Sequence, residues 1–419
     1  MKRINRYFQG DKAIWIVFLF LCVISLVEVF SAASTLTYKS GSYLGPLLRH
    51  GMFLGAGALV VVGVHNIPCR WFKIVPILTL PLSCVFMTML LLGWGVSINE
   101  GARWMELMGI RFQPSEIAKC SLITATALIL ASMQTENGAD KRAFKWILSL
   151  TVVTCGLILP ENLSTACLLF GIIVLMMFIG RVPLIQLGKL LGSIAVVCFI
   201  AVSALLSIPV QSEPALKETP LIGRTVTWKH RLEKHVNHST KKLTPEEFDI
   251  DRDAQVAHAN IAIATSNVWG KMPGNSVERD FLSQAFSDFI YAIIIEEMGL
   301  LGGAFVLFLY VVLLFRAGRI ASRCERNFPA FLVMGLALQL FAQALINMLV
   351  AVGLFPVTGQ PLPLISRGGT STIINCVYIG MILSVSRYAK RKQAQREGQR
   401  NIVEAPDVTN EYYSEKGLV

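Results

Sequence analysis

Ten apolar segments dominate the 419-residue chain, and most are close to the roughly 20 residues that cross a bilayer as an α-helix. With 54% hydrophobic and 16% charged residues, the chain has too little charge to cover the surface of a soluble domain of this size. We therefore predict an all-α polytopic membrane protein. Its predicted spans are residues 13–33, 46–65, 73–93, 113–132, 143–160, 163–179, 185–208, 287–316, 329–353 and 371–388.

The net charge of +11 is distributed as expected for a membrane protein rather than a nucleic-acid-binding one, because the basic residues cluster in alternate loops. This pattern places both termini in the cytoplasm. It predicts a cytoplasmic N-terminus (1–12), one ten-span domain (13–388) and a cytoplasmic C-terminal tail (389–419). The first apolar run is long for a cleaved signal peptide, so we interpret it as a retained anchor. The clusters are Lys2, Arg3, Arg6 and Lys12; Lys141, Arg142 and Lys145; Arg316, Arg319, Arg323 and Arg326; and Arg387, Lys390, Arg391 and Lys392.

Neither cysteines nor histidines predict a metal site. All nine cysteines fall in predicted spans or cytoplasmic loops, so no disulfide framework or CxxC site is implied. Three histidines, His230, His235 and His238, lie close together in the outer loop, but the lysines beside them favour a solvated loop face over a zinc site.

Three polar elements interrupt the apolar pattern on the side opposite the basic loops. They are the large extracytoplasmic loop 209–286 between spans seven and eight, the stretch 93–119, and the stretch 355–371. Proline and glycine at this density stop a regular helix, which is tolerated at membrane depth only where the backbone lines a cavity. In the large loop, "RTVTWKHRLEKHVNH" and "DAQVAHANIAIA" predict two short amphipathic helices.

Three carboxylates accompany the eighth apolar segment, where a charge is costly unless it has a partner, a watery cavity or a chemical role. Asp288 opens the segment, and Glu296 and Glu297 are expected about 12 Å deeper along the same helix. Asp288 suits a general base at the mouth of a cavity. It equally suits a helix N-terminus that favours an acid, and the residues alone do not separate these alternatives.

Other charged residues admit two interpretations each. Glu116 and Lys119 lie at i and i+3 on one helix face, as an ion pair, as part of a polar cavity where Lys119 meets an anionic substrate group, or as both. Arg103 and Trp104 form either an interfacial anchor or a binding site. Arg367 precedes two glycines, which would let backbone N–H groups approach a phosphate or simply begin a helix.

At these residues the chain resembles the SEDS proteins, the FtsW/RodA/SpoVE family, and most closely the FtsW cell-division branch. The resemblance extends from about 13 to 388. Its ordered motifs are "NEGARWMELMGIRFQPSEIAK", "PENLSTA", "WGKMPGNS", "SDFIYAIIIEEMG" and "TGQPLPLISRGGTS". The family's aspartate in its "HTDFIFA" motif falls on Asp288, and its RW, PSE and K positions fall on Arg103, Trp104, Pro114, Ser115, Glu116 and Lys119.

The resemblance implies a bacterial peptidoglycan glycosyltransferase. Such an enzyme acts on an undecaprenyl-pyrophosphate-linked disaccharide and polymerises lipid II, with inversion, onto a nascent glycan strand during septal cell-wall synthesis. It implies an extracytoplasmic active site in the cytoplasmic membrane, a class B penicillin-binding transpeptidase as partner, and other divisome proteins.

The resemblance also implies residue roles. Asp288 is the base for the N-acetylglucosamine C4 hydroxyl, and a divalent cation (Mg²⁺ or Mn²⁺) is a candidate cofactor beside the pyrophosphate. Residues expected to bind substrate are Arg49, Arg103, Trp104, Glu116, Lys119, Ser366 and Arg367, with Gln284, Glu296 and Glu297 in support; no resident metal ligands are expected.

The chain departs from the family pattern at four positions. Gln284 and Phe286 replace the family's Glu and His before the motif aspartate, which puts an auxiliary proton or metal role there in doubt. Asn162 stands where many members have Asp, and Arg367 where others have Met or Tyr.

Two other functions fit the same features. A lipid II flippase would also need many spans and buried charges, although no inverted repeat is evident. A non-catalytic divisome scaffold would need the helices but not the Asp288 carboxylate.

Overall fold

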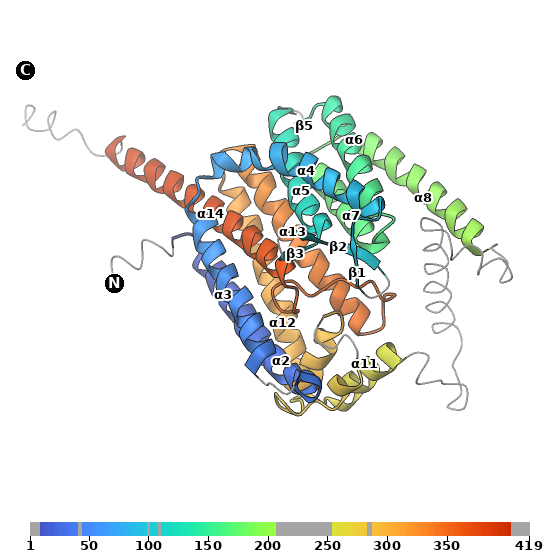
Figure 1. Cartoon of the computed structure of the whole chain (residues 1–419). Coiled ribbons are helices and arrows are strands. Elements are labelled where there is room, and N and C mark those ends of the chain that lie inside the picture. The colour runs from blue at the N-terminus through green and yellow to red at the C-terminus, as the bar shows by residue number, and fades with distance from the viewer. Residues whose placement is uncertain are drawn as a thin grey trace, which may run out of the picture.

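A computed structural model describes residues 9–40, 44–98, 101–107, 110–136, 138–206, 254–282 and 287–403 (Figure 1). All ten predicted segments are helical, and seven helices in the described part of the chain are long and apolar enough to cross a membrane. The prediction of an all-α polytopic membrane protein is confirmed, whereas the number of helices that cross stays a prediction. The ten are α2 (Lys12–Ser40), α3 (Leu44–Asn66), α4 (Val75–Leu91), α5 (Pro114–Ser132), α6 (Lys141–Ile158), α7 (Leu163–Ile179), α8 (Leu184–Leu206), α12 (Ile290–Ser322), α13 (Asn327–Ala351) and α14 (Thr370–Val403).

The helices α5, α13 and α14 form the centre of the bundle. Helix α13 packs against α12, α5, α7 and α14, while α3 packs along α14 and α8 lies at the edge (Figure 1). In the apolar stretch of α5, 72% of the residues are buried inside the protein, against 22% for α3. The central helices can therefore carry polar side chains, whereas α3 exposes apolar side chains such as Leu59, as expected of a helix that faces lipid.

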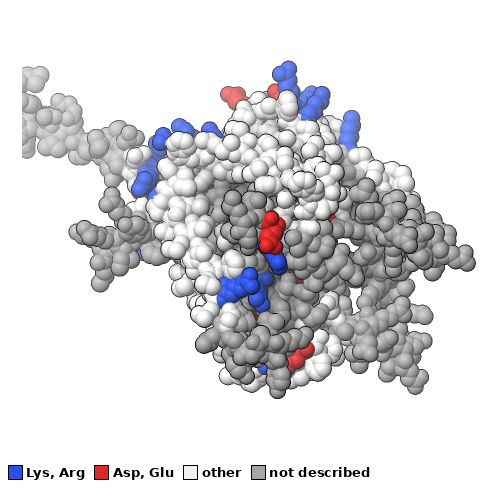
Figure 2. All heavy atoms as spheres, in the orientation of Figure 1, with Lys and Arg blue, Asp and Glu red and all other residues white. Residues whose placement is uncertain are grey.

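Short elements cover the two ends of the bundle. One end carries the 3-10 helix η1 (Cys69–Lys73), the two-residue strands β4 (Gln134–Thr135) and β5 (Gly138–Ala139), and most of the described basic residues; we call it the basic end. Lys and Arg gather along the upper rim in Figure 2, and a further group of charged side chains lies near the centre of the view. At the opposite, distal end lie α11 (Ala254–Thr265) and the 3-10 helix η3 (Glu278–Asp280). The predicted helix over "DAQVAHANIAIA" is thus confirmed as α11.

The stretch between α4 and α5 is a small antiparallel sheet that the sequence analysis did not predict. Strands β1 (Val96–Ile98), β2 (Gly101–Leu107) and β3 (Ile110–Phe112) pair in the order β1-β2-β3. Val96 lies opposite Trp104, and Leu107 lies opposite Ile110. Main-chain pairing within the sheet satisfies backbone groups that a loop would leave without partners.

Helix α12 is two helical arms, not the single helix predicted over 287–316. Gly299 lies between them with φ 72° and ψ −178°, a conformation essentially limited to glycine. The Tyr291 hydroxyl donates to the Gly303 carbonyl at 3.1 Å, although in one straight helix these residues would lie about 18 Å apart along the axis. The segment 290–298 therefore folds back against 300–322, and the prediction of a continuous helix is wrong.

The close approach at Gly299 leads to a stability prediction. A Cβ added there would lie 2.1 Å from the Val268 carbonyl oxygen and 2.6 Å from the Gly270 nitrogen. Gly299→Ala should therefore lower the free energy of unfolding by about 2 kcal/mol or more. Thermal unfolding in detergent measures the effect. The matched control is Gly156→Ala in α6, where a new Cβ meets nothing within 4 Å; equal midpoints for the two variants would contradict the prediction.

Candidate functional site

An irregular loop, residues 355–369, enters the bundle between α13 and α14 and forms the floor of the candidate site. Three prolines and positive φ angles at Gly359 and Leu364 exclude regular helix there. Side chains from other helices bind its carbonyl groups: Tyr310 donates to Pro363, and Ser25 donates to Ile365 at 2.7 Å. The predicted irregular backbone at membrane depth is thus stabilised by hydrogen bonds from surrounding helices.

A polar stripe on α13 supports both this loop and Asp288. Gln339, Gln343 and Asn347 recur every four residues, so they share one helix face. The Asn347 side-chain amide donates to the carbonyls of Asp288 and Gln360, both at 2.8 Å, and that of Gln343 donates to the carbonyl of Pro361 at 3.0 Å. These amides were not predicted from the sequence, although their spacing in an apolar segment was the signal that could have found them.

Asp288 lies beside the loop on the turn that precedes α12. The Ser366 hydroxyl donates to the Ser287 carbonyl at 2.7 Å, and the Ser287 hydroxyl donates to Asp288 Oδ1 at 2.9 Å. Helix α12 has Phe289 at its N-cap, so Asp288 lies one residue before that position. Its side chain is half-buried, with its backbone fixed and part of its surface open. A carboxylate placed in this way can accept a proton from a bound substrate.

Two arginines lie near one another in this region. Desolvation and the charge of Arg49 both lower the pKa of the half-buried Arg367 guanidinium. Arg367 follows Ser366, whose hydroxyl bonds the residue before Asp288, so the cation and the carboxylate stand on adjoining segments. The Ser25 hydroxyl bonds His50 at 2.8 Å and the Ile365 carbonyl at 2.7 Å, which brings the segments of Arg49 and Arg367 together. Two guanidinium groups in one region suit a phosphate, which would offset their mutual repulsion.

Lys119 and Glu116 form a buried ion pair. Lys119 Nζ lies 2.7 Å from Glu116 Oε1 and 3.1 Å from Gln343 Oε1, and the two charged side chains are 0% and 4% exposed. The ion pair expected from the sequence is thus observed, whereas contact of Lys119 with an anionic substrate stays a prediction. Through Gln343, the pair connects to the Pro361 carbonyl and so supports the site loop. Ser366 is similarly buried, with its hydroxyl bonded to Leu362 N and Ser287 O.

The paired glutamates lie at the distal end of the fold-back, with partners from the outer segment 267–280 and from α2. Glu296 accepts from Lys271 Nζ at 2.6 Å and from Ser276, and Glu297 accepts from Ser31 and lies 3.8 Å from Arg279 Nη1.

The depth predicted for these glutamates is wrong in direction. Ser31, the partner of Glu297, is six residues beyond Ser25, the partner of the site loop, or about 9 Å further along α2. The glutamates are therefore distal to Asp288 rather than deeper than it. The turn at Gly299 reverses the chain and so inverts the order expected for one continuous helix.

The remaining predicted residues are only partly described. Trp104 lies half-buried in β2 opposite Val96, and Arg103 belongs to the same strand, with its side chain outside the described part. Gln284 and the three histidines at 230, 235 and 238 lie outside the described residues, as does the first amphipathic helix predicted for the large loop.

An apolar groove of ≈ 690 Å³ lies between α2 and α3. Leu26, Phe30, Leu48 and Met52 line it from these helices, and Pro273 and Gly274 lie at its distal edge. Arg49 belongs to the same stretch of α3. The groove can take a hydrocarbon chain whose polar end lies near the two arginines.

The described residues bring together no group of three His, Cys, Asp or Glu side chains that could hold a metal ion.

The family model described as "FTSW_RODA_SPOVE: Cell cycle protein" matches residues 11–391. A protein of Nitrosomonas europaea named "Probable peptidoglycan glycosyltransferase FtsW" is 30% identical over 376 residues, which covers 88% of this chain and 90% of the relative. A protein of the same name from Hahella chejuensis is 32% identical over 93% of this chain and 92% of its own length.

A solved structure described under "Structural coordination of polymerization and crosslinking by a peptidoglycan synthase complex" has the same fold. Its TM-score is 0.67 at 23% identity, and the match covers 91% of this chain and 98% of the solved chain.

Proposed function

The chain belongs to the FtsW/RodA/SpoVE family of cell cycle proteins, and from this membership we propose that it is a peptidoglycan glycosyltransferase that polymerises lipid II during septal wall synthesis. The observation that carries the proposal is the placement of Asp288, half-buried and hydrogen-bonded beside the loop that bears Arg367. A flippase or scaffold would not require a carboxylate held in this way.

The proposed reaction is a single displacement with inversion. The C4 hydroxyl of the acceptor N-acetylglucosamine attacks the anomeric carbon of the donor sugar, and Asp288 accepts the hydroxyl proton. The bond between that carbon and the pyrophosphate oxygen breaks, and the pyrophosphate leaves with the electron pair. Arg49 and Arg367 stabilise the charge that develops on it. A divalent cation bound to the pyrophosphate would supply further positive charge.

The α2–α3 groove supports a lipid-linked substrate. One undecaprenyl chain would lie against Leu26, Phe30 and Met52, with its pyrophosphate toward Arg49. The proposal places the active site on the extracytoplasmic side of a bacterial inner membrane, because the basic end of the bundle is expected in the cytoplasm. A class B penicillin-binding transpeptidase and other divisome proteins are the proposed partners. The named activity of the curated relatives supports this proposal.

The role of Arg367 gives a kinetic prediction. Arg367→Gln should lower kcat for polymerisation about tenfold, since a contact to the departing pyrophosphate is lost while Arg49 remains. Initial rates with labelled lipid II measure the change. Arg142→Gln, at the exposed start of α6 at the basic end, removes the same charge far from the site and should leave the rate unaltered. Equal rates for the two variants would show that Arg367 does not stabilise the departing pyrophosphate.

Polymerisation and transport can be separated in one vesicle experiment. The purified protein is reconstituted with fluorescent lipid II, and both glycan polymer and the fraction of lipid II reached by an external quencher are followed. The proposal expects polymer from the protein together with its transpeptidase partner. Movement of lipid II across the bilayer without polymer would support a flippase instead.

A further inference from the structure

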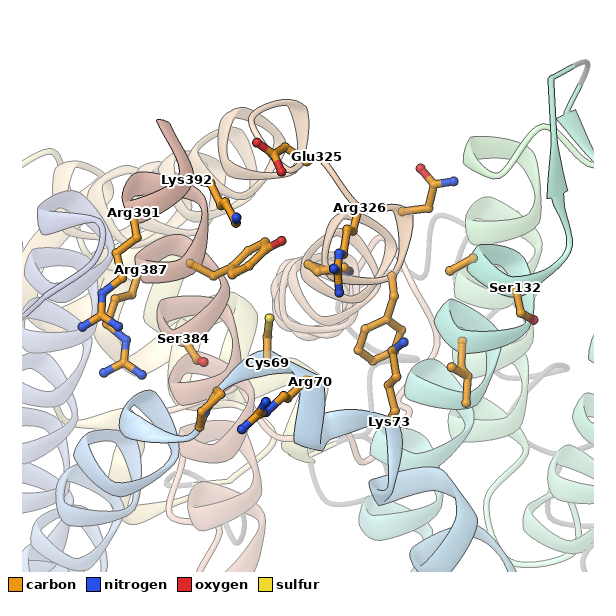
Figure 3. Close-up of a pocket in the computed structure, with 17 residues that line it drawn as sticks. Cys69, Arg70, Lys73, Ser132, Glu325, Arg326, Ser384, Arg387, Arg391 and Lys392 are labelled. Atoms are coloured by element: carbon orange, nitrogen blue, oxygen red, sulfur yellow. The ribbon is translucent and has the colours of Figure 1, made fainter. Parts of the chain in front are cut away.

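A second cavity, of ≈ 630 Å³, lies at the basic end of the bundle, where η1, α5, α13 and α14 meet (Figure 3). Its apolar walls include Leu128, Ala131 and Phe328, and its charged groups come from η1, from the residues just before α13 and from α14. The polymerisation site proposed above uses none of these residues. The cavity therefore needs an explanation of its own.

Six lysines and arginines line the cavity, against one carboxylate, Glu325. That carboxylate forms an ion pair with Arg396 at 2.8 Å. Arg387 donates to the side-chain and backbone oxygens of Asn66, at 3.1 and 2.9 Å. Arg391 donates to Gln9 at 3.2 Å, and both arginines lie toward α3 in Figure 3.

Lys73, Arg326 and Lys392 surround the same opening from three different elements (Figure 3). Within the described part of the chain, none of them forms an ion pair with a carboxylate. Lys73 Nζ lies 5.6 Å from the centre of the Phe328 ring, a cation–π contact that holds the amine at the cavity. Three like charges around one opening repel one another unless an anion lies between them.

The N-terminus of α13 adds to the positive potential. Arg326 is its N-cap and makes no side-chain capping bond, and Asn327, Phe328 and Pro329 in the first turn line the cavity. Backbone N–H groups of a first turn have no partner within the helix, and the helix dipole favours an anion there. The three cations and the N-terminus of the 25-residue helix α13 thus both favour an anionic ligand.

Trp71 and Ile74 place the cavity at the membrane surface. They flank Lys73 in sequence and are 52% and 41% exposed. An exposed tryptophan beside basic residues is typical of the level of lipid headgroups. A ligand there can have its anionic group among the cations and its acyl chains against the neighbouring apolar surface.

We propose that this cavity binds the phosphodiester headgroup of an anionic phospholipid, between Lys73, Arg326 and Lys392. Basic pockets between membrane helices on the cytoplasmic side are suited to such headgroups. The proposal is independent of glycan polymerisation, because it involves no residue of the Asp288 site.

The test measures binding of a fluorescent phosphatidylglycerol to the purified full-length protein in detergent. Unlabelled phosphatidylglycerol should compete far better than phosphatidylcholine or inorganic phosphate, and rising salt should weaken binding. The triple variant Lys73→Gln, Arg326→Gln, Lys392→Gln should bind about tenfold to a hundredfold more weakly. The matched control is a second triple variant that lacks three exposed charges at the same end of the bundle. It carries Lys141→Gln, Arg142→Gln and Lys145→Gln, and it should bind the lipid as tightly as the wild type.

Three results would overturn the proposal. Equal weakening by the two triple variants would show that the lipid responds to surface charge in general. Inorganic phosphate competing as well as phosphatidylglycerol would assign the cavity to a soluble anion. Residues 404–419 form an acidic tail that includes Glu404, Asp407, Glu411 and Glu415. If the protein binds the lipid only after this tail is deleted, the natural occupant of the cavity is the tail and not a lipid. The competition experiments need only wild-type protein, so they test the proposal even if a variant does not fold.

Discussion

Asp288→Asn is expected to lower the rate of glycan polymerisation by a factor of about 10² to 10⁴, the usual contribution of a general base. Asparagine keeps the size of the side chain and can still accept a hydrogen bond from Ser287, but it cannot take the proton of the acceptor hydroxyl. The loss should therefore appear in kcat, with little change in the KM for lipid II. Initial rates over a range of lipid II concentrations separate these two parameters.

The matched control is Glu136→Gln, which also converts a carboxylate to an amide. Glu136 lies exposed directly after β4 at the basic end, far from Asp288, so its neutralisation should leave polymerisation unchanged. Both variants should unfold close to the wild-type midpoint, which excludes loss of the fold as the cause. An Asp288→Asn enzyme with wild-type kcat would show that this carboxylate is not the base.

Lys119→Met should lower the free energy of unfolding by about 3–5 kcal/mol, the usual cost of breaking a buried ion pair from one side. The change leaves the Glu116 carboxylate, 4% exposed, without its cation, and Gln343 Oε1 without the Lys119 donor. Because Gln343 also holds the Pro361 carbonyl, the site loop should loosen and polymerisation should fall as well. Denaturation in mixed detergent micelles measures the stability change.

A second substitution distinguishes the buried charge from simple loss of packing. Lys119→Met combined with Glu116→Gln removes both charges and should recover part of the lost stability. Arg111→Met, which breaks an exposed pair, should cost less than about 1 kcal/mol. If the double variant is no more stable than Lys119→Met alone, the unpaired carboxylate is not the cause.

The sequence predicted the helices well because length and hydropathy are nearly sufficient for a chain in lipid. It could not predict the fold-back of α12. Residues 290–298 and 300–322 are both rich in apolar side chains, apart from the two glutamates, and single glycines are common in membrane helices. Only tertiary contacts, such as Tyr291 with Gly303, distinguish a fold-back from a continuous span. For the same reason, the sequence predicted the glutamates to lie deeper than Asp288, whereas the structure places them distal to it.

The candidate site was predictable where a residue conflicted with its surroundings. Asp288 stood out as a carboxylate in an apolar segment, and the structure places it beside the loop of Arg367. The interval of three residues between Glu116 and Lys119 could not distinguish a self-contained pair from a substrate site. Asn347 and Gln343 escaped notice because neutral amides are less conspicuous than charges, although they fix the backbone on both sides of the site.

The most direct test of the central claim is the glycan product of the purified wild-type chain. Labelled lipid II is incubated with this protein and its transpeptidase partner, with no other glycosyltransferase present, and the products are separated by length. Our account predicts a ladder of glycan strands that disappears when Asp288→Asn replaces the wild type. Unchanged lipid II with the wild-type protein, or the same ladder from both proteins, would contradict it.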